Sequence, residues 1–331
     1  MRQQYLRMLA VFVAVLPFAV VALMAALVPE SREVPPVEPR NELVQGQPAP
    51  TAVLVEAAQK PTWPAVLPAG AADLAGSVGA ITGRPGVAPR SQPLEEDAGL
   101  QGRIEAYLSG QTGTYGVAIA DLTTNRVAYV NPGRTFSAAS TYKLLVMYRV
   151  HQLLAEGQLS LGEPIEIDGS PSTVGEALNQ MITVSSNEAA FALVDRIGGW
   201  GSVVAAAQEV GMAGTYADGE LFWTTPADML AFFDALAGGR LVSAEMSNRM
   251  IDLLAAQGIN DRLPAGLPGG VAIAHKTGEL PGVRNDVGIV FTPSGRYVIC
   301  VLGEGDEVEA TNVIAGISSL AWEELSGGAT Q

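Results

Sequence analysis

The sequence predicts an α+β fold: a five-stranded antiparallel sheet flanked by helices, with an all-helical insert between its strands. Three observations support this prediction. Between about residues 97 and 327 the apolar spacing follows the order helix, two strands, several helices, three strands, helix. Short turns join neighbouring strands, and only antiparallel strands can be joined in this way. The chain is 48% hydrophobic and 16% charged, enough to bury a core and too apolar for a wholly disordered protein.

The elements follow in order. A helix is predicted over 100–108, then a hairpin of strands 114–122 and 126–130 around a polar turn. A helix follows Ser140. Further helices are predicted at 173–181, 188–197, 203–210, 226–236 and 244–256. Strands at 271–277, 286–291 and 296–302 precede a closing helix at 307–325. The economical arrangement places the terminal helices on one face of the sheet and the insert on the other.

The composition excludes several classes of function. The formal charge is 19 − 34 = −15, which speaks against a basic surface for nucleic acid. Cys300 is the single cysteine, so no internal disulfide and no cysteine-built metal site can form. Two histidines, His151 and His275, lack the spacing of a zinc site, and we expect neither a metal nor another cofactor.

The first 96 residues differ from the rest. Residues 8–28 carry no charge and would span about 31 Å as a helix, which fits a transmembrane anchor. Arg2 and Arg7 precede this run, which predicts a cytoplasmic N-terminus and an extracytoplasmic domain. A cleaved signal peptide is the alternative, but the run is long and its small-x-small site is poor. Residues 29–96 form a predicted Pro/Ala-rich linker, since residues 29–95 hold 12 of the 21 prolines.

A serine and a lysine stand three residues apart where the helix after Ser140 begins. Positions i and i+3 of a helix share a face, so the ammonium of Lys143 can reach the hydroxyl of Ser140. A desolvated lysine can activate a serine nucleophile, and a helix N-terminus offers donors to an oxyanion. Alone, the Ser-x-x-Lys pattern is weak evidence of a catalytic site, because a serine that caps a helix and a surface lysine three residues later give the same sequence pattern.

Two further motifs change that interpretation. Ser185-Ser186-Asn187 lies between two predicted helices, and Lys276-Thr277-Gly278 ends a predicted strand. In this order, Ser-x-x-Lys, Ser-x-Asn and Lys-Thr-Gly mark serine enzymes that recognise penicillin. Together with the stretches 173–178, 224–229 and 261–268, they make residues 97–326 resemble the class A β-lactamase family. The resemblance implies a β-lactamase/DD-peptidase-like fold for a catalytic domain at 97–327.

The resemblance also implies the catalytic roles. Ser140 is the acylated nucleophile and Lys143 is its activating amine. Ser185 relays a proton to the leaving group, and Asn187 orients Lys143 and the substrate amide. Lys276 acts with them by holding the substrate carboxylate.

The remaining expectations concern substrate binding. Thr277 joins Lys276 in holding the carboxylate, and Gly278 leads to Glu279, whose backbone N–H would complete the oxyanion hole with that of Ser140. Arg284 precedes the next predicted strand, which lacks the family's usual arginine. It is a candidate for the missing charge, and an ordinary loop arginine is the alternative.

Two departures from the family matter for turnover. The middle residue of its Ser-Asp-Asn motif is here Ser186. More seriously, the family's deacylating glutamate lies in an E-x-x-L-N stretch, which is absent from the short segment 213–223. Glu220 is the candidate substitute, although we favour a loop-surface carboxylate there; Glu188 and Glu279 have weaker placement. The sequence therefore predicts acylation with impaired deacylation.

A Ser-His-Asp mechanism is the rival. It needs a histidine beside the serine, whereas His151 would lie about 16 Å along the helix from Ser140. His275 should point away from Lys276 across the strand. We expect both histidines, and a buried Cys300, to be structural. The expected partners are a β-lactam or peptidoglycan-derived small molecule and, through the anchor, a membrane. Alternatives are a D-Ala-D-Ala peptidase or esterase on the same scaffold, or a sensor that is acylated once.

Overall fold

The structure is a computed structural model that describes residues 90–218 and 221–327. The predicted anchor at residues 8–28, most of the predicted linker and Glu220 lie outside these residues. The helices of the described part are α2 (Ala98–Leu108), α3 (Lys143–Ala155), α4 (Val174–Thr183), α5 (Asn187–Arg196), α6 (Trp200–Val210), α7 (Pro226–Ala237), α8 (Ala244–Ala255) and α9 (Glu307–Leu325). Two 3₁₀ turns accompany them, η1 (Ala139–Tyr142) and η2 (Leu263–Gly266).

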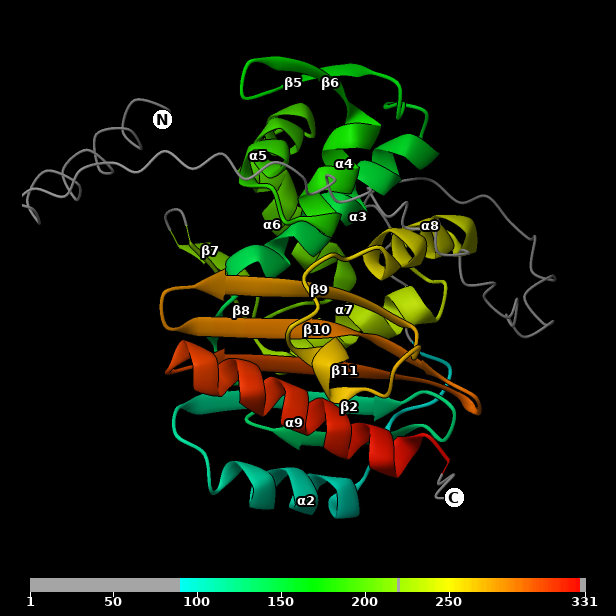
Figure 1. Cartoon of the computed structure of the whole chain (residues 1–331). Coiled ribbons are helices and arrows are strands. Elements are labelled where there is room, and N and C mark those ends of the chain that lie inside the picture. Colours follow the sequence, from blue (N-terminus) through cyan, green and yellow to red (C-terminus); the bar gives the residue numbers. More distant parts are fainter. Residues whose placement is uncertain (1–89, 219–220, 328–331) are drawn as a thin grey trace, which may run out of the picture. The chain divides into compact units, whose positions relative to one another are not determined.

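A mixed sheet of six strands forms the centre of this described part (Figure 1). Its order is β1-β3-β2-β11-β10-β9, with the bounds β1 (Glu95–Glu96), β3 (Arg126–Val130), β2 (Thr114–Asp121), β11 (Gly295–Glu304), β10 (Val283–Thr292) and β9 (Ile273–Leu280). The five predicted antiparallel strands are all present. The sixth strand, β1, was not predicted: it pairs in parallel with β3 and comes from the segment assigned to the linker.

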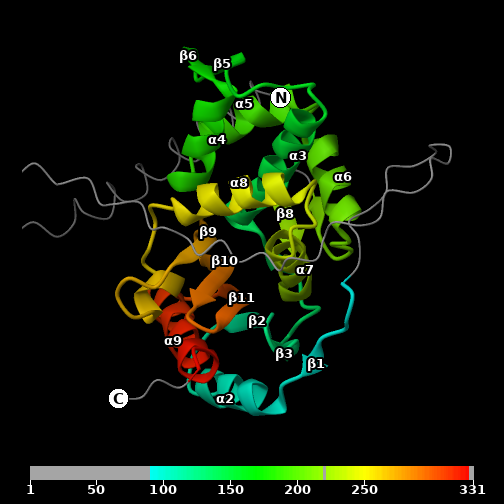
Figure 2. The same ribbon diagram turned by 90° about the vertical axis from the view of Figure 1, so that its right-hand side faces the viewer.

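Helices cover both faces of the sheet. α2 and α9 lie on one face and α7 on the other, while α3, α4, α5, α6 and α8 gather beyond the β9 edge (Figures 1 and 2). The alternation of β2 matches these layers: Val117 and Ile119 enter the core under α9, and the smaller Ala118 and Ala120 face the core shared with the insert. The α+β class is confirmed. The terminal helices share one face as predicted, but of the insert helices α7 alone covers the other face, and the rest lie beyond the β9 edge.

Two small sheets complete the insert. β5 (Pro164–Ile167) pairs with β6 (Ser170–Thr173), and β4 (Phe136–Ser137) pairs with β8 (Leu221–Thr224), which pairs in turn with β7 (Tyr216–Asp218). Polar caps fix the helices between them. Thr173 and Glu176 form a capping box on α4, and Ser186 caps α5 through the backbone N–H of Ala189. The cap at Ser186 leaves Ser185 outside α5 and makes Asn187 its first residue.

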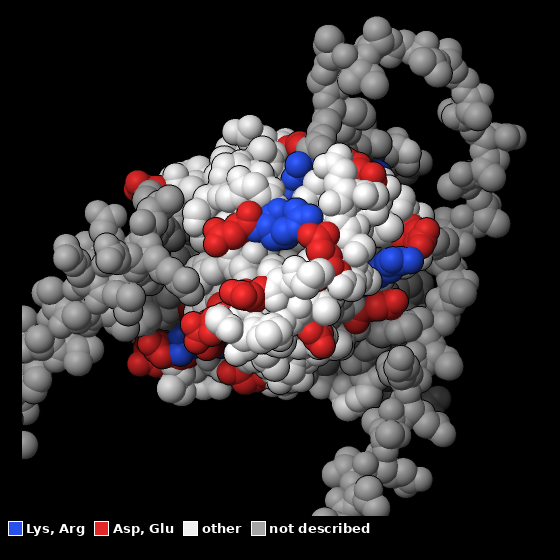
Figure 3. All heavy atoms as spheres, turned by 90° about the horizontal axis from the view of Figure 1, so that it is seen from above, with Lys and Arg blue, Asp and Glu red and all other residues white. Residues whose placement is uncertain are grey.

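Within residues 90–218 and 221–327, no single helix has both the length and the apolar character needed to cross a membrane. One pair meets this requirement by length and composition alone, α5 with α6, and it is bent by 86°. On the face made by the insert, basic groups adjoin acidic ones (Figure 3). Ion pairs of the insert include Arg196 with Glu163 and Arg249 with Glu245.

Candidate active site

Ser140 lies in the 3₁₀ turn η1, between β4 and α3. The sequence predicted an α-helix from this point, but α3 begins only at Lys143. In a 3₁₀ turn the side chains at i and i+3 are eclipsed, which brings the two motif residues directly together. The Lys143 Nζ lies 3.2 Å from the Ser140 Oγ. The preceding residue, Ala139, has a φ of 44°, so the backbone is strained where it presents the serine.

The ammonium of Lys143 is completely buried and is surrounded by oxygens. Besides the Ser140 Oγ, its Nζ lies 2.5 Å from the Ser185 carbonyl oxygen, 3.2 Å from the Ser185 Oγ and 2.8 Å from the Asn187 Oδ1, so three N–H donors are shared among four oxygens. Burial lowers the pKa of Lys143 to about 8, against an opposing effect of nearby Glu188 and Glu279. About a tenth of the amine is then neutral at pH 7, compared with less than about a thousandth at its ordinary pKa.

Ser185 connects the two motif lysines. Its φ is 59°, an uncommon conformation for a serine, and it turns the hydroxyl toward both amines. The Lys276 Nζ lies 3.0 Å from the Ser185 Oγ, nearly the same distance as Lys143 Nζ. When both amines donate, they occupy the lone pairs of this oxygen. The hydroxyl hydrogen is then left for an acceptor in the pocket, as a proton relay requires.

Lys276 is also completely buried, in the middle of the edge strand β9. Its Nζ makes a second hydrogen bond to the Thr277 carbonyl at 3.0 Å. Burial, together with the positive charge of Lys143, lowers the pKa of Lys276 to about 7. Two buried amines beside one hydroxyl form a positive centre, and an anionic substrate group would be stabilised there.

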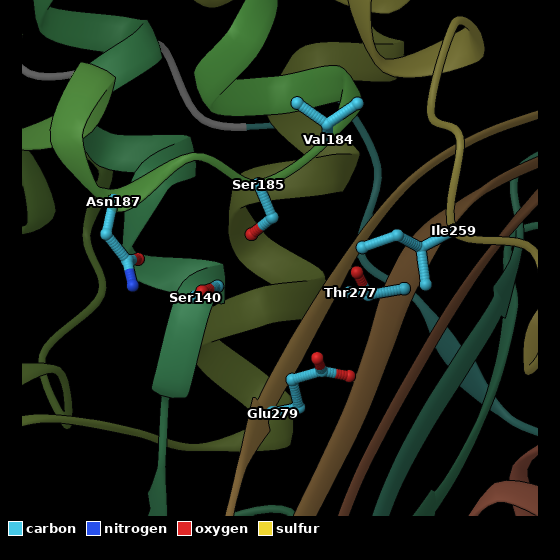
Figure 4. Close-up of a pocket in the computed structure, with 7 residues that line it drawn as sticks. All are labelled: Ser140, Val184, Ser185, Asn187, Ile259, Thr277 and Glu279. Carbon is cyan, nitrogen blue, oxygen red and sulfur yellow. The ribbon is translucent and has the colours of Figure 1, made fainter. Parts of the chain in front are cut away.

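Five of the predicted residues, Ser140, Ser185, Asn187, Thr277 and Glu279, line a pocket of about 210 Å³. Figure 4 shows Asn187 on one side of it, Ile259 and Thr277 on the other, and Ser140 between them. Its lining residues are Ser140, Val184, Ser185, Asn187, Ile259, Thr277 and Glu279. The three motifs, far apart in the sequence, therefore converge on one opening.

Gly278 determines how closely β9 approaches the nucleophile. A Cβ at this position would stand 2.8 Å from the Ala138 carbonyl oxygen, so only glycine fits beside η1. Opposite Gly278 on β10, the Asn285 amide donates to the carbonyls of Ser137 at 2.8 Å and Ala138 at 3.2 Å. Asn285 was not predicted as a site residue, because nothing in the three motifs indicates a hydrogen bond from the next strand to the nucleophile turn.

Glu279 lines the pocket, and Figure 4 shows its side chain there. Its carboxylate pairs with the guanidinium of Arg262, which is 1% exposed and also donates to the Asn285 carbonyl at 3.4 Å. Arg262 was not predicted as a site residue, because it lies 14 positions before Lys276 in a stretch quoted only for its family likeness. The buried guanidinium fixes where the negative charge of Glu279 lies at the pocket wall.

The structure does not bring Arg284 to the pocket. Side chains alternate along β10, and the Asn285 side chain contacts the carbonyls of Ser137 and Ala138, so Arg284 points to the opposite face, toward α9. There its guanidinium pairs with Glu307 and donates to the carbonyls of Leu280 at 3.1 Å and Val283 at 2.9 Å. Arg284, predicted either to bind substrate or to be an ordinary loop arginine, therefore does not line the pocket, since the strand register turns it toward α9.

Both histidines are engaged away from Ser140. The His275 Nδ1 lies 2.8 Å from Asp286 Oδ1, on the strand face opposite Lys276, and its Nε2 lies 3.1 Å from Asn260 Oδ1. The His151 Nδ1 is 2.8 Å from the Met147 carbonyl. Cys300 is buried, which raises the pKa of its thiol. Across the described ranges no cluster of three His, Cys, Asp or Glu side chains is arranged to hold a metal.

A hairpin, β7–β8, stands where the sequence predicted a short loop. The Phe222 carbonyl accepts from the Ala138 N–H at 2.8 Å, which fixes the hairpin against the nucleophile turn. The predicted substitute, Glu220, lies outside the described residues; its neighbours in the hairpin, Asp218 and Leu221, are exposed. Among the described residues that line the pocket, Glu279 is the one carboxylate.

Glu188 is engaged elsewhere. Its carboxylate accepts from the Ser186 hydroxyl at 3.1 Å. Hydrogen bonds from its own backbone N–H and from Ser186 hold the pKa of Glu188 below its usual value. The side chain is exposed at the start of α5 and does not line the pocket.

A serine hydrogen-bonded to a buried lysine, beside an edge strand that carries Lys-Thr-Gly, defines a serine hydrolase of the acyl-enzyme type. Residues 99–325 match the Beta-lactamase enzyme family, and the chain belongs to this family. The predicted class A β-lactamase-like fold is thereby confirmed.

Individual relatives agree with this family. Beta-lactamase 1 of Bacillus cereus is 26% identical over 238 residues, which cover 63% of this chain and 76% of that protein. The solved structure of PBP-A has a TM-score of 0.67 and 26% identity, covering 70% of this chain and 98% of PBP-A. A PBP-A mutant solved as an acyl-enzyme complex with penicillin G has a TM-score of 0.66, 26% identity and the same coverage. An ancestral class A beta-lactamase, GNCA, has a TM-score of 0.62 and 26% identity, and the match covers 68% of this chain and 99% of the GNCA chain.

Proposed function

We propose that the chain is an exported, membrane-anchored serine hydrolase that is acylated at Ser140 by β-lactam-like amides and releases the acyl group slowly. One observation carries the proposal. The buried Lys143 amine contacts the Ser140 hydroxyl, the proton-relay hydroxyl of Ser185 and the amide oxygen of Asn187 at the same time. The penicillin G acyl-enzyme of a PBP-A mutant supports the choice of substrate class.

Acylation follows from this arrangement. The neutral amine of Lys143 takes the proton of the Ser140 hydroxyl as Oγ attacks the amide carbonyl carbon. The backbone N–H groups of Ser140 and Glu279 stabilise the resulting oxyanion. When the C–N bond breaks, the hydroxyl of Ser185 gives its proton to the departing nitrogen and regains one from Lys143, which returns to its neutral form. Lys276 and Thr277 hold the substrate carboxylate at the other end of the pocket.

Deacylation needs a further base to activate water. The carboxylate of Glu279 is paired with Arg262, and that of Glu188 accepts from Ser186. Lys143 would have to act a second time while Lys276 holds a bound carboxylate. We infer that the acyl-enzyme persists, so a D-Ala-D-Ala peptidase or a β-lactam sensor is the second candidate function, favoured by the hairpin β7–β8 that replaces the family's glutamate-bearing loop.

A fluorescent penicillin followed on a denaturing gel tests the proposal. Purified chain should acquire a covalent label that survives a chase with unlabelled penicillin for many minutes, and the Ser140→Ala variant should acquire none. A label that disappears rapidly during the chase would identify an efficient β-lactamase. Absence of label on the wild-type chain, or an adduct on Ser140→Ala by intact-mass measurement, would contradict the acylation proposal.

A further inference from the structure

The side chain of Asn285 on β10 is completely buried against the two residues that lead into η1. Its amide nitrogen donates to the carbonyl of Ser137 at 2.8 Å and to that of Ala138 at 3.2 Å. Its Oδ1 accepts from the backbone N–H of Gly303 on β11 at 3.2 Å. One buried amide, hydrogen-bonded through both its nitrogen and its oxygen, thus connects the chain before the nucleophile to β10 and β11.

Gly278 gives Asn285 its access to η1. The two residues are paired between β9 and β10, so their side-chain positions lie on the same face of the sheet. A Cβ at Gly278 would stand 2.8 Å from the Ala138 carbonyl oxygen and 3.3 Å from the Ala139 Cβ. Because the edge strand has no side chain at this point, the amide of the second strand reaches the chain before Ser140 directly.

The Ala138 carbonyl lies where the backbone is strained. It also accepts from the backbone N–H of Thr141 at 3.0 Å and from the Thr141 hydroxyl at 2.7 Å. The next residue, Ala139, has a φ of 44°, in the left-handed region that an alanine rarely adopts. A strained conformation persists only where the surrounding contacts fix it. The donors to the Ala138 carbonyl therefore help to hold Ala139, and with it the direction of the Ser140 N–H that follows.

Asn285 also contacts the β9 side of the proposed oxyanion hole. Its backbone is in register with Gly278, the residue before Glu279. Its backbone carbonyl accepts from the guanidinium of Arg262 at 3.4 Å, and this guanidinium pairs with the Glu279 carboxylate. The two proposed oxyanion donors, the N–H groups of Ser140 and Glu279, are therefore held by contacts that meet at one residue.

We propose that Asn285 is a positioning residue, which fixes the separation of η1 from β9 and so aligns the N–H groups of Ser140 and Glu279 on the oxyanion formed during acylation. The role rests on the proposed function. Asn285 does not line the pocket and acts through the carbonyls of Ser137 and Ala138. Because an oxyanion exists only after the serine has attacked, a misaligned hole slows acylation and leaves the binding of intact substrate unchanged.

Labelling at increasing concentrations of a fluorescent penicillin tests this role. It gives the limiting rate constant of acylation and the penicillin concentration at half of that rate. Asn285→Leu keeps a branched side chain and removes the donors, so the limiting rate constant should fall about 10- to 100-fold. The half-saturating concentration should stay within about 2-fold of the wild-type value. Asn285→Asp is the second variant, because its carboxylate still accepts from Gly303 and cannot donate, and it decides the outcome if Asn285→Leu does not fold.

Two further variants separate positioning from a general loss of stability. Ser247→Ala also removes a buried donor to a backbone carbonyl, that of Leu241 at 2.8 Å, and should label at the wild-type rate. Gly278→Ala opens the gap between η1 and β9 from the other strand. Combined with Asn285→Leu, it should therefore lower the rate by less than the product of the two single losses.

The outcomes are distinct. A wild-type limiting rate constant in a folded Asn285 variant, a loss that appears in the half-saturating concentration instead, or single losses that multiply would each overturn the positioning role and leave the proposed function standing. A wild-type chain that acquires no label would overturn both.

Discussion

At the scale of single residues, Lys143 is placed as the base for Ser140. Its Nζ lies 3.2 Å from the Oγ, and the other amine of the site, Lys276, contacts Ser185 instead. We predict that Lys143→Ala lowers the rate constant of acylation by about 10²- to 10⁴-fold, the contribution of a positioned base. Stopped-flow or timed gel labelling measures it. Removal of a buried charge should not unfold the chain, and an unchanged rate constant in a folded variant would assign the base elsewhere.

The two lysines also predict a pH profile. Lys143 acts as a base only when neutral, so the rate constant at low substrate concentration should rise as pH approaches its pKa of about 8. Lys276 binds a carboxylate only when charged. Its contribution to substrate binding, and so to the rate constant of acylation, should fall as pH rises through its pKa of about 7. Because the lysines interact through Ser185, the apparent values belong to the pair.

These opposing limbs predict a bell-shaped profile for a penicillin, with its maximum between about pH 7 and 8. The methyl ester of the same penicillin has no carboxylate for Lys276, so its rate constant should rise through about pH 8 and then level off. The same profile for both compounds would show that Lys276 does not hold the carboxylate.

The site residues that could be predicted from the sequence were those that belong to a short motif. The spacing of Ser140 and Lys143 predicts that their side chains lie on one helix face. The order of the three motifs predicted that they meet at one pocket. Asn285 and Arg262 act across strands, through a register that no local pattern encodes. Arg284 was misplaced for the same reason: one residue of register decides which face of β10 it occupies.

At the scale of elements, the approach of β9 to η1 depends on Gly278. A Cβ there would stand 2.8 Å from the Ala138 carbonyl oxygen, and a backbone oxygen can move away only at a large cost in free energy. We predict that Gly278→Ala pushes the edge strand away from Ser140 and lowers acylation by about 10²-fold, as misplacement of reacting groups by about 1 Å does. Labelling kinetics measure the loss.

Gly269→Ala is the matched control, since a Cβ at Gly269 has nothing within 4 Å and the residue needs no left-handed backbone. This variant should label at the wild-type rate. Equal rates in both variants would show that the contact at Gly278 does not position the strand.

The hairpin β7–β8 predicts slow deacylation. It lies in the segment where the resemblance to class A enzymes places the loop that carries their base, and Phe222 in it stacks on Tyr142 of the nucleophile turn. With a chromogenic cephalosporin we expect one burst of product per enzyme, followed by turnover well below the enzyme median of about 10 s⁻¹. Sustained turnover near that median would contradict the prediction, and its loss in Glu220→Gln would identify the base.

Elements with a regular spacing of apolar residues could be predicted from the sequence, whereas elements that depend on pairing between strands could not. The closing helix was placed at 307–325, as observed for α9, because its cap at Asp306 and its apolar spacing are local. β10 was predicted to start at 286 but begins at Val283, since Arg284 and Asn285 do not read as strand residues. The hairpin β7–β8 was missed because its strands are only three and four residues long.

At the scale of the whole molecule, the folded domain begins before residue 97. Arg90 pairs with Asp234, which also pairs with Arg240, and β1 adds to the sheet beside β3. These contacts tie the last residues of the predicted linker to α7 and to the sheet edge. An attached segment of this kind resists proteolysis better than a free linker does.

The attachment of residues 90–96 to the domain predicts where protease can cut in a test of the membrane anchor. If residues 8–28 span the membrane with the N-terminus in the cytoplasm, the chain should fractionate with membranes, and protease added from outside should cut within residues 29–89. The released fragment should start before Arg90 and still label with fluorescent penicillin, because the domain is intact. In Arg90→Ala the tie to Asp234 is lost, so cleavage should extend toward Asp97. A mature chain that begins near Ala25 or Ala26 would show a cleaved signal peptide instead, and protection of the whole chain from external protease would place the domain in the cytoplasm.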